Sequence, residues 1–183
     1  MPPAETRPGD STRRTPTVLL IAALVLLAAR VATGLYEERH PTTLPDLVHW
    51  RPIGDAVAEA RQTRKPLLYD FTADWCAPCQ TMKRDLFADR DAASRIERMF
   101  VPVRVLDRQQ EDGRNAAEVD SLQRRFRIES FPTLVVVPAD GGDSTVLVGY
   151  QGRGATLQQL AEAHVRLMMP PGFRTRPGNV RPR

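Results

Sequence analysis

Apolar side chains form one long run near the start of the chain. Residues 18–29 are all valine, leucine, isoleucine or alanine; Arg30 interrupts the run, and residues 31–36 are again mostly apolar. A run of this length is typical of a short membrane helix, in which an arginine can extend toward the membrane surface, or of a signal peptide. No clear small-residue cleavage site follows, so the pattern favours an uncleaved transmembrane anchor over residues 18–36.

The segments that flank this run are polar. Basic residues precede it and two glutamates follow it, so we expect the N-terminus in the cytoplasm and the remainder of the chain outside. Prolines and arginines predict a disordered segment over residues 1–17 and a disordered basic tail over residues 170–183, which could contact anionic lipid or a partner. Residues 37–51 contain two prolines and are predicted to be a linker.

From residue 52 to residue 169 the apolar positions alternate between helical and strand-like spacing, which predicts one folded domain. We expect helices over residues 55–64, 76–87, 92–99, 116–126 and around 157–167, and strands over residues 67–72, 100–106, 133–137 and 145–149. Residues 107–114 are predicted to be a polar loop and residues 140–143 a hairpin turn. Alternating strands and helices that end in a hairpin and a helix predict an α/β sandwich with a mixed central sheet.

The charge distribution argues against a nucleic-acid partner. The formal net charge of +4 comes from the ends, because residues 170–183 hold four arginines and no acid and residues 1–17 add one positive charge. The rest of the chain is therefore close to neutral, whereas a nucleic-acid groove places basic residues on folded elements.

The chain has only two cysteines, Cys76 and Cys79, in a Cys-x-x-Cys motif. A fold held together by disulfides would need more cysteines at wider spacings. A zinc site needs about four ligands, and the three histidines are scattered along the sequence. The spacing therefore favours redox chemistry without a metal or any cofactor other than the cysteine pair.

The predicted position of the motif, between the strand 67–72 and the helix 76–87, suits that chemistry. A thiol at a helix N-terminus meets free N–H groups and the positive end of the helix dipole, and both favour the reactive thiolate. Two intervening residues let the second sulfur reach the first, so a mixed disulfide can be resolved within one molecule. Cys76 and Cys79 are accordingly the predicted catalytic residues.

The residues around the motif resemble the thioredoxin family. Trp-Cys-x-x-Cys follows Asp-Phe-x-Ala, which begins at Asp70, and Phe-Pro-Thr follows about 50 residues later at residues 131–133. The resemblance covers residues 53–167 and implies a three-layer thioredoxin-like sandwich. Within the family the chain most resembles the C-terminal domain of DsbD-type membrane disulfide interchange proteins, on the Lys-Pro that leads the strand, the Ala-Asp-Trp-Cys, and Lys83 and Phe87 after the motif.

This resemblance implies roles for five residues around the motif. Cys76 matches the exposed attacking cysteine and Cys79 the resolving one. Trp75 matches the aromatic that shields the site, and Pro132 matches the family's cis-proline beside the disulfide, a rare bond geometry that marks a constrained site. Phe131 and Pro132 are then expected to present backbone to the substrate, together with Trp75.

The resemblance also implies a buried acid at Asp70, six residues before Cys76. A carboxyl buried near the sulfurs would have a raised pKa and could take the proton from Cys79. The family's buried lysine near that acid has no match here, because the alignment places Val103 at its position. A strand-end acid facing solvent is the alternative reading of Asp70.

Three functions compete at this stage. The first is a membrane-tethered extracytoplasmic thiol–disulfide oxidoreductase that acts in the reducing direction, as the Ala-Pro dipeptide between the cysteines indicates. The second is a Cu(I)-binding metallochaperone, since soft thiolates suit copper and Met82 lies close in sequence. The third is a redox-inert interaction domain, which intact cysteines and Pro132 disfavour.

The first function carries expectations about partners and location. Client proteins with disulfides or thiols would be the substrates, and a separate electron donor is needed, for which a membrane disulfide interchange protein is the candidate. We expect a monomer, attached to the inner membrane through residues 18–36, with its catalytic domain in the periplasm. Cleavage of that segment would instead give a secreted soluble form.

Overall fold

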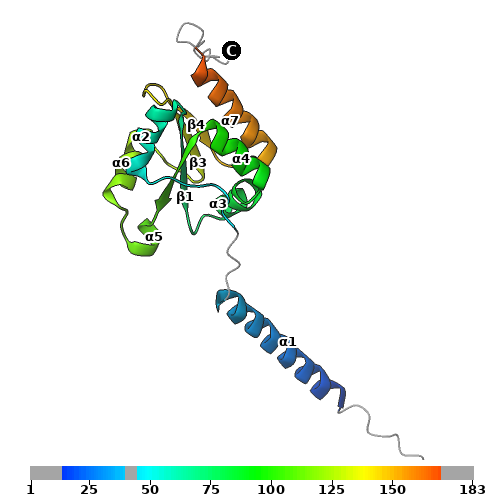
Figure 1. Ribbon diagram of the computed structural model, residues 1–183. Helices are drawn as coiled ribbons and strands as arrows, with labels where there is room; N and C mark the ends of the chain where they lie inside the picture. The colour runs from blue at the N-terminus through cyan, green and yellow to red at the C-terminus, as the bar shows by residue number, and fades with distance from the viewer. Residues whose placement is uncertain (1–13, 40–44, 170–183) are drawn as a thin grey trace, which may run out of the picture. The chain divides into compact units, whose positions relative to one another are not determined.

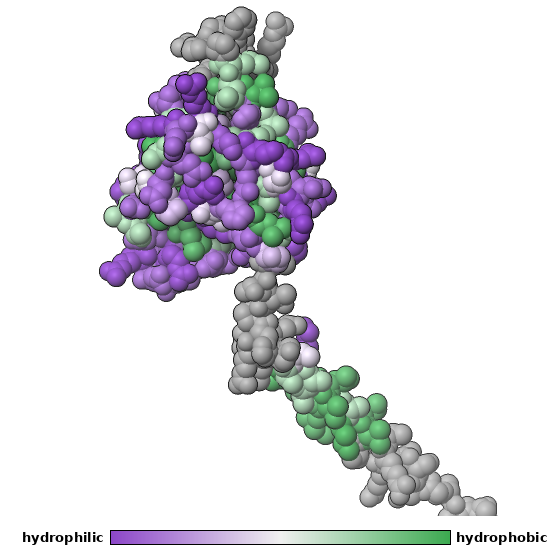
Figure 2. All heavy atoms as spheres, in the orientation of Figure 1, coloured by the Kyte–Doolittle hydropathy of each residue, from purple (hydrophilic) through white to green (hydrophobic). Residues whose placement is uncertain are grey.

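The computed structural model describes residues 14–39 and 45–169, and the chain divides into two compact units between Thr43 and Leu44 (Figure 1). In the first unit, helix α1 (Arg14–Arg39) begins before and ends after the predicted anchor. Its side chains from Val18 to Val31 are exposed and mostly apolar, in contrast to the hydrophilic visible face of the domain (Figure 2). Among the described residues, no helix is both long enough and apolar enough to cross a membrane. The prediction of disorder over residues 1–17 is wrong for residues 14–17, which belong to α1; the rest of that segment and the tail 170–183 lie outside the described residues.

The second unit is built on a mixed sheet of four strands in the order β2-β1-β3-β4. The strands are β1 (Leu67–Ala73), β2 (Val101–Asp107), β3 (Thr133–Val137) and β4 (Thr145–Val148). β1 and β2 are parallel, whereas β3 is antiparallel to both β1 and β4. The prediction of an α/β sandwich with a mixed central sheet is confirmed.

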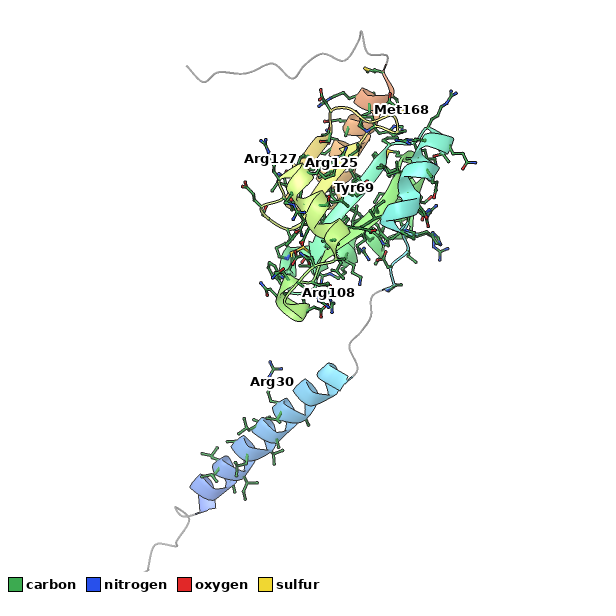
Figure 3. The ribbon with its side chains drawn as sticks, turned by 90° about the vertical axis from the view of Figure 1, so that its left-hand side faces the viewer. Arg30, Tyr69, Arg108, Arg125, Arg127 and Met168 are labelled. Carbon is green, nitrogen blue, oxygen red and sulfur yellow. A yellow bond between two sulfur atoms is a disulfide. The ribbon has the colours of Figure 1, made fainter. Side chains whose placement is uncertain are left out.

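Helices cover both faces of this sheet. They are α2 (Ile53–Thr63), α3 (Ala77–Met82), the π-helical turn η1 (Lys83–Phe87), α4 (Arg90–Met99), α5 (Gln109–Asp112), α6 (Ala117–Phe126) and α7 (Arg153–Met168). Tyr69 and Phe71 pack with α2 and α6 on one face, where Figure 3 shows Tyr69. Leu68 packs with α3, η1, α4 and α7 on the other. Because side chains alternate along a strand, Asp70 belongs to the face that carries the helix after the cysteines.

Two predicted elements differ in detail. The helix expected over residues 76–87 widens into the π-helical turn η1, in which the Ala88 N–H donates to the Lys83 carbonyl. The wider turn brings Phe87 into line with Met82, five residues earlier, and both side chains are fully buried. The expected polar loop over residues 107–114 contains the short helix α5, which has no buried residue.

Residues 45–51, predicted to be linker, lie against the domain. Val48 is buried, the Leu47 N–H donates to the Phe87 carbonyl at 3.0 Å, and the Arg51 N–H donates to the Pro102 carbonyl at 2.8 Å. This segment therefore contacts both the end of η1 and the outer edge of β2.

Candidate active site

The two cysteines form a disulfide at the junction of β1 and α3. β1 ends at Ala73, whose carbonyl accepts from the Cys76 N–H at 3.2 Å, and Cys76 is the N-cap of α3. The backbone N–H of Cys79 donates to the Cys76 Sγ at 3.2 Å. When the pair is reduced, this N–H would stabilise a thiolate on Cys76, since a hydrogen bond to the charged form favours that form.

The outer side of the disulfide is aromatic. Trp75 is 49% exposed and meets Phe131 edge to face, with ring centroids 6.0 Å apart. Phe131 packs in turn against Cys76 and Cys79, and its bond to Pro132 is cis. Cys76 itself is only 3% exposed in this disulfide form, rather than exposed as the resemblance implies. The Trp75 and Phe131 rings therefore lie next to the disulfide, and whether these residues bind substrate stays a prediction.

The inner side of the disulfide is charged. Asp70 is 1% exposed, so the solvent-facing reading of this residue is wrong. Its Oδ2 accepts from Nε of Arg104 at 3.4 Å, whereas Oδ1 is buried with no hydrogen-bond partner. Burial raises the pKa of Asp70 to about 6, although the Arg104 charge pulls it down. This carboxyl can therefore gain or lose a proton close to neutral pH.

A small cavity of about 110 Å³ lies between Asp70 and Cys79. Cys79 and Asp70 both line it, together with Lys83, Arg104 and Asp74. The cavity is large enough to hold water. The acid and the sulfur therefore border one space through which a proton can pass.

The cation beside Asp70 was missed in the sequence. The alignment points to Val103, but that side chain is fully buried on the α2 and α6 face of the sheet. Its neighbour Arg104 lies directly opposite Asp70 in the parallel register of β1 and β2, on the same face. Side-chain alternation along the predicted strand 100–106 is the signal that could have identified Arg104.

Met82 does not extend the cysteine pair toward a copper site. Its side chain is fully buried among Leu68, Leu86 and Phe100, in a core cluster separate from that of the cysteines. Among the described residues, no group of three or more His, Cys, Asp or Glu side chains could hold a metal ion.

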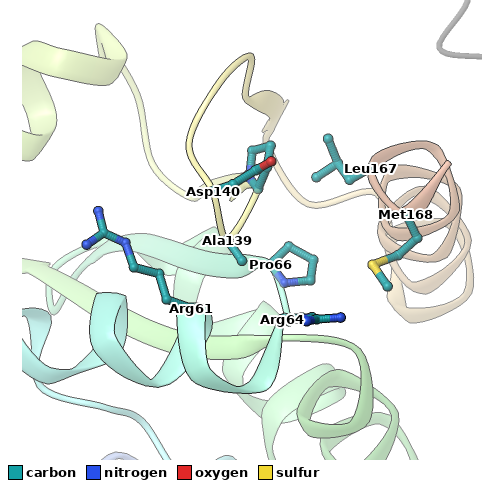
Figure 4. A pocket seen from close by; sticks show the side chains of 8 residues that line it. Arg61, Arg64, Pro66, Ala139, Asp140, Leu167 and Met168 are labelled. Carbon is teal, nitrogen blue, oxygen red and sulfur yellow. The ribbon is translucent and has the colours of Figure 1, made fainter. Parts of the chain in front are cut away.

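A separate hollow of about 440 Å³ lies at the other end of β1, beyond its first residue (Figure 4). It is lined by two arginines, one aspartate and several apolar residues: Arg61, Arg64, Pro66, Pro138, Ala139, Asp140, Leu167 and Met168. None of these lining residues belongs to the cysteine site, which follows the carboxyl end of β1. The size of this hollow therefore gives no information about the chemistry at the cysteines.

This chain is similar to several known proteins. The DsbD thiol:disulfide interchange protein of Yersinia pestis is 23% identical over 149 residues, which cover 78% of this chain and 24% of that protein. A thioredoxin of Mycobacterium tuberculosis is 31% identical over 100 residues, covering 55% of this chain and 75% of that protein. The solution structure of a thioredoxin from Thermus thermophilus matches with a TM-score of 0.57 and 26% identity, covering 67% of this chain and 91% of that one.

The chain thus spans about a quarter of the length of the DsbD proteins it matches. The family model of the thioredoxin-like domain matches residues 53–164, which is most of the folded unit. The chain belongs to the thioredoxin-like family, and its Cys76–Cys79 disulfide is the redox centre expected of a thiol–disulfide oxidoreductase.

Proposed function

We propose that this protein is a membrane-tethered, extracytoplasmic oxidoreductase that reduces disulfides of client proteins. The observation that carries the proposal is the Cys76–Cys79 disulfide at the start of α3, with aromatic rings outside it and a titratable acid behind it. Both faces of the pair thus carry the groups that exchange needs.

We propose the following reducing half-reaction. In the reduced protein the Cys76 thiolate attacks one sulfur of a client disulfide, forms a mixed disulfide and releases the first client thiolate. The Asp70 carboxylate takes the proton from the Cys79 thiol through the shared cavity. The Cys79 thiolate then attacks the Cys76 sulfur, the second client thiolate leaves, and two electrons have passed to the client.

Client binding is proposed at Trp75, Phe131 and Pro132. The aromatic pair offers exposed apolar surface next to Cys76. The chain at Phe131 leads directly into the start of β3. An extended client segment could add its backbone beside this end of the strand.

The direction and the donor form a second part of the proposal. The Ala77–Pro78 dipeptide and the likeness to DsbD both favour a reducing pair, which needs a separate electron donor. A membrane disulfide interchange protein is the proposed donor. We expect a reduction potential nearer to that of thioredoxin, about −270 mV, than to that of the oxidant DsbA, about −120 mV.

Membrane attachment is proposed through residues 18–36, with the domain in the periplasm of a bacterial cell. The support is the exposed apolar surface of α1 and the DsbD likeness. The full chain should fractionate with membranes and resist extraction by high salt, and a reporter fused after Arg183 should be active only outside the cytoplasm. A shortened chain in the soluble fraction would instead favour a cleaved signal peptide.

Insulin reduction with the purified full chain tests the core of this proposal. The reduced protein should reduce insulin disulfides in proportion to its concentration, and the Cys76→Ser, Cys79→Ser double variant should not. A wild-type chain without activity that takes up Cu(I) stoichiometrically would support the copper alternative.

A further inference from the structure

One arginine behind the disulfide serves two carboxylates. Arg104 donates from Nε to Asp70 at 3.4 Å and from Nη1 to Asp46. Asp46 comes from the segment before the first helix of the domain, far from the cysteine motif in sequence. Three charged groups with a net charge of −1 are thus gathered at one partly buried point.

Asp46 accepts further hydrogen bonds that fix this arrangement. Its other oxygen, Oδ1, accepts from the Trp50 indole at 2.9 Å and from the Val48 N–H at 3.3 Å. The Trp50 ring lies under the Arg104 guanidinium, 4.1 Å from its central carbon, and meets Phe87 edge to face at 4.9 Å. This cation–π contact adds to the hydrogen bonds that hold the guanidinium in place.

The two carboxylates are not equivalent. The Asp46 side chain is 21% exposed, whereas that of Asp70 is 1% exposed. With one guanidinium for two acids, burial makes the inner carboxyl the one that takes up a proton. Asp46 therefore competes with Asp70 for the charge of Arg104.

We infer that residues 46–50 are a positioning element for the acid behind Cys79: Asp46 and Trp50 hold Arg104, and by sharing its charge Asp46 keeps Asp70 able to bind and release a proton. This inference rests on the proposed exchange through Cys79 for its functional meaning. The charge sharing itself does not.

The other charged groups near Asp70 are few. Lys83 of η1 and Asp74 of the turn before α3 line the same cavity, and Cys79 of α3 titrates there once the disulfide is reduced. On the opposite side, β3 places the apolar Leu134 beside Asp70. Among the described residues, Arg104 is the side chain that hydrogen-bonds to Asp70, so a change at Asp46 should act through the shared guanidinium as well as by direct repulsion between the two carboxylates.

The direct test is the titration of the Asp70 side-chain carboxyl by carbon NMR in the full chain, oxidised and reduced. Asp46→Asn keeps an acceptor for Trp50 but removes the competing charge, so the midpoint of Asp70 should fall by about 0.5 to 1 pH unit. Arg104→Gln should move the midpoint up. A midpoint that stays in place or rises in Asp46→Asn would overturn the inference.

Glu59→Gln is the matched control. Glu59 pairs at 2.8 Å with Arg51, which directly follows residues 46–50. The variant therefore removes one negative charge from a neighbouring ion pair and leaves the contacts of Arg104 unchanged. The Asp70 midpoint should not move in this variant. A downward shift equal to that of Asp46→Asn would mean that overall charge, and not the shared arginine, sets the midpoint, and would refute the inference.

Exchange kinetics separate this inference from the proposed function. If Asp70 is the base, the insulin-reduction rate should fall at low pH with the titration midpoint of Asp70, and this acid limb of the pH profile should shift when the midpoint shifts. Asp46→Asn should then be about three- to fivefold faster than wild type at pH 5. A wild-type chain that reduces no disulfide would sink the proposed function, while the NMR titration would still decide the charge sharing. A moved midpoint with an unmoved acid limb would contradict the role toward Cys79.

Discussion

The two sides of the disulfide are built from opposite materials. On the outer side, two aromatic rings and a cis-proline surround Cys76, and Trp75 is half-exposed. On the inner side, the buried Asp70 and the shared Arg104 lie behind Cys79. The apolar surface suits contact with a client, whereas the buried charges suit control of a proton.

The two sides also differ in the substitutions that they can tolerate. An exposed ring can be replaced without leaving a buried group unpaired, so its loss should weaken binding and little else. A buried charge that loses its partner is costly, because its desolvation is no longer offset. Changes on the inner side should therefore appear in pH profiles and in stability, and changes on the outer side in client affinity.

The largest effect is expected at the sulfurs, where the two sides meet. Cys76→Ser should abolish exchange, because the serine hydroxyl does not attack disulfides. Cys79→Ser should leave attack intact but prevent resolution, so mixed disulfides with clients should accumulate and be visible on non-reducing gels. Mixed disulfides trapped by Cys76→Ser instead would reverse the roles of the two cysteines and with them the assignment of the two sides.

Asp70→Asn should give the next largest effect, and it depends on pH. The pKa of Asp70 is raised from its ordinary value of 3.8 to about 6 in the folded protein, so folding must bury a charge above pH 6 but not below pH 4. Wild-type stability should thus fall, relative to the variant, as pH rises from about 4 to about 6, and the difference should stay constant above that. The variant should be more stable by up to about 3 kcal/mol at pH 8 and indistinguishable at pH 4.

Denaturant unfolding of the oxidised wild type and variant at both pH values measures this difference. The comparison cancels contributions from other carboxylates, because both chains share them. Equal stabilities at pH 8 would mean that Arg104 fully compensates the Asp70 charge. The same variant should slow the resolution step of exchange, since asparagine cannot accept the Cys79 proton.

Trp75→Ala tests the outer side alone. The ring lies at the surface beside Cys76, and removing it should raise the KM for a protein client about tenfold while leaving the Asp70 midpoint unchanged. Val146→Ala is the matched control, because Val146 is also an exposed apolar side chain, at 45%, but pairs with Val135 further along β3 from Pro132. If Trp75→Ala lowered stability at pH 8 as well, the division between the two sides would be wrong.

The outer side is also the part that the sequence predicted. The Cys-x-x-Cys motif, Trp75 and Phe131-Pro132 stand in local patterns, and the junction of strand and helix follows from apolar spacing. The prediction of the thioredoxin-like family and of its mixed sheet is confirmed on that basis. Short-range patterns suffice where the contacting residues are neighbours in sequence or belong to a known motif.

The inner side could not be predicted in the same way. Arg104 is 34 residues from Asp70 and 58 from Asp46, so their meeting depends on strand register and on a segment without regular structure. Asp46 and Trp50 precede the first helix of the domain and were included in the linker 37–51 because proline and polar residues predict irregular chain. An irregular segment can still pack, and apolar spacing does not reveal where.

The smallest effect is expected for a charged pair on the outside of the site. Arg108 donates to Asp74 at 2.8 Å and also pairs with Asp112, and Figure 3 shows Arg108 toward the end of the domain that carries α5. Both members of the Arg108–Asp74 pair are well exposed, at 40% and 55% of their side chains. Water and salt screen such a pair, so it contributes little despite its good geometry.

Arg108→Gln therefore separates charge near the cysteines from charge buried behind them. Asp74 directly precedes Trp75, so the variant removes the cation that pairs with the motif's own turn while leaving Arg104 untouched. The insulin-reduction rate should change by less than about twofold, and the change should vanish in high salt because screening already removes the interaction. The acid limb of the pH profile should stay where it is. A limb that moved as far as in Arg104→Gln would show that exposed charge reaches Asp70 through the shared cavity, and the inner side would then have to include Asp74 and Arg108.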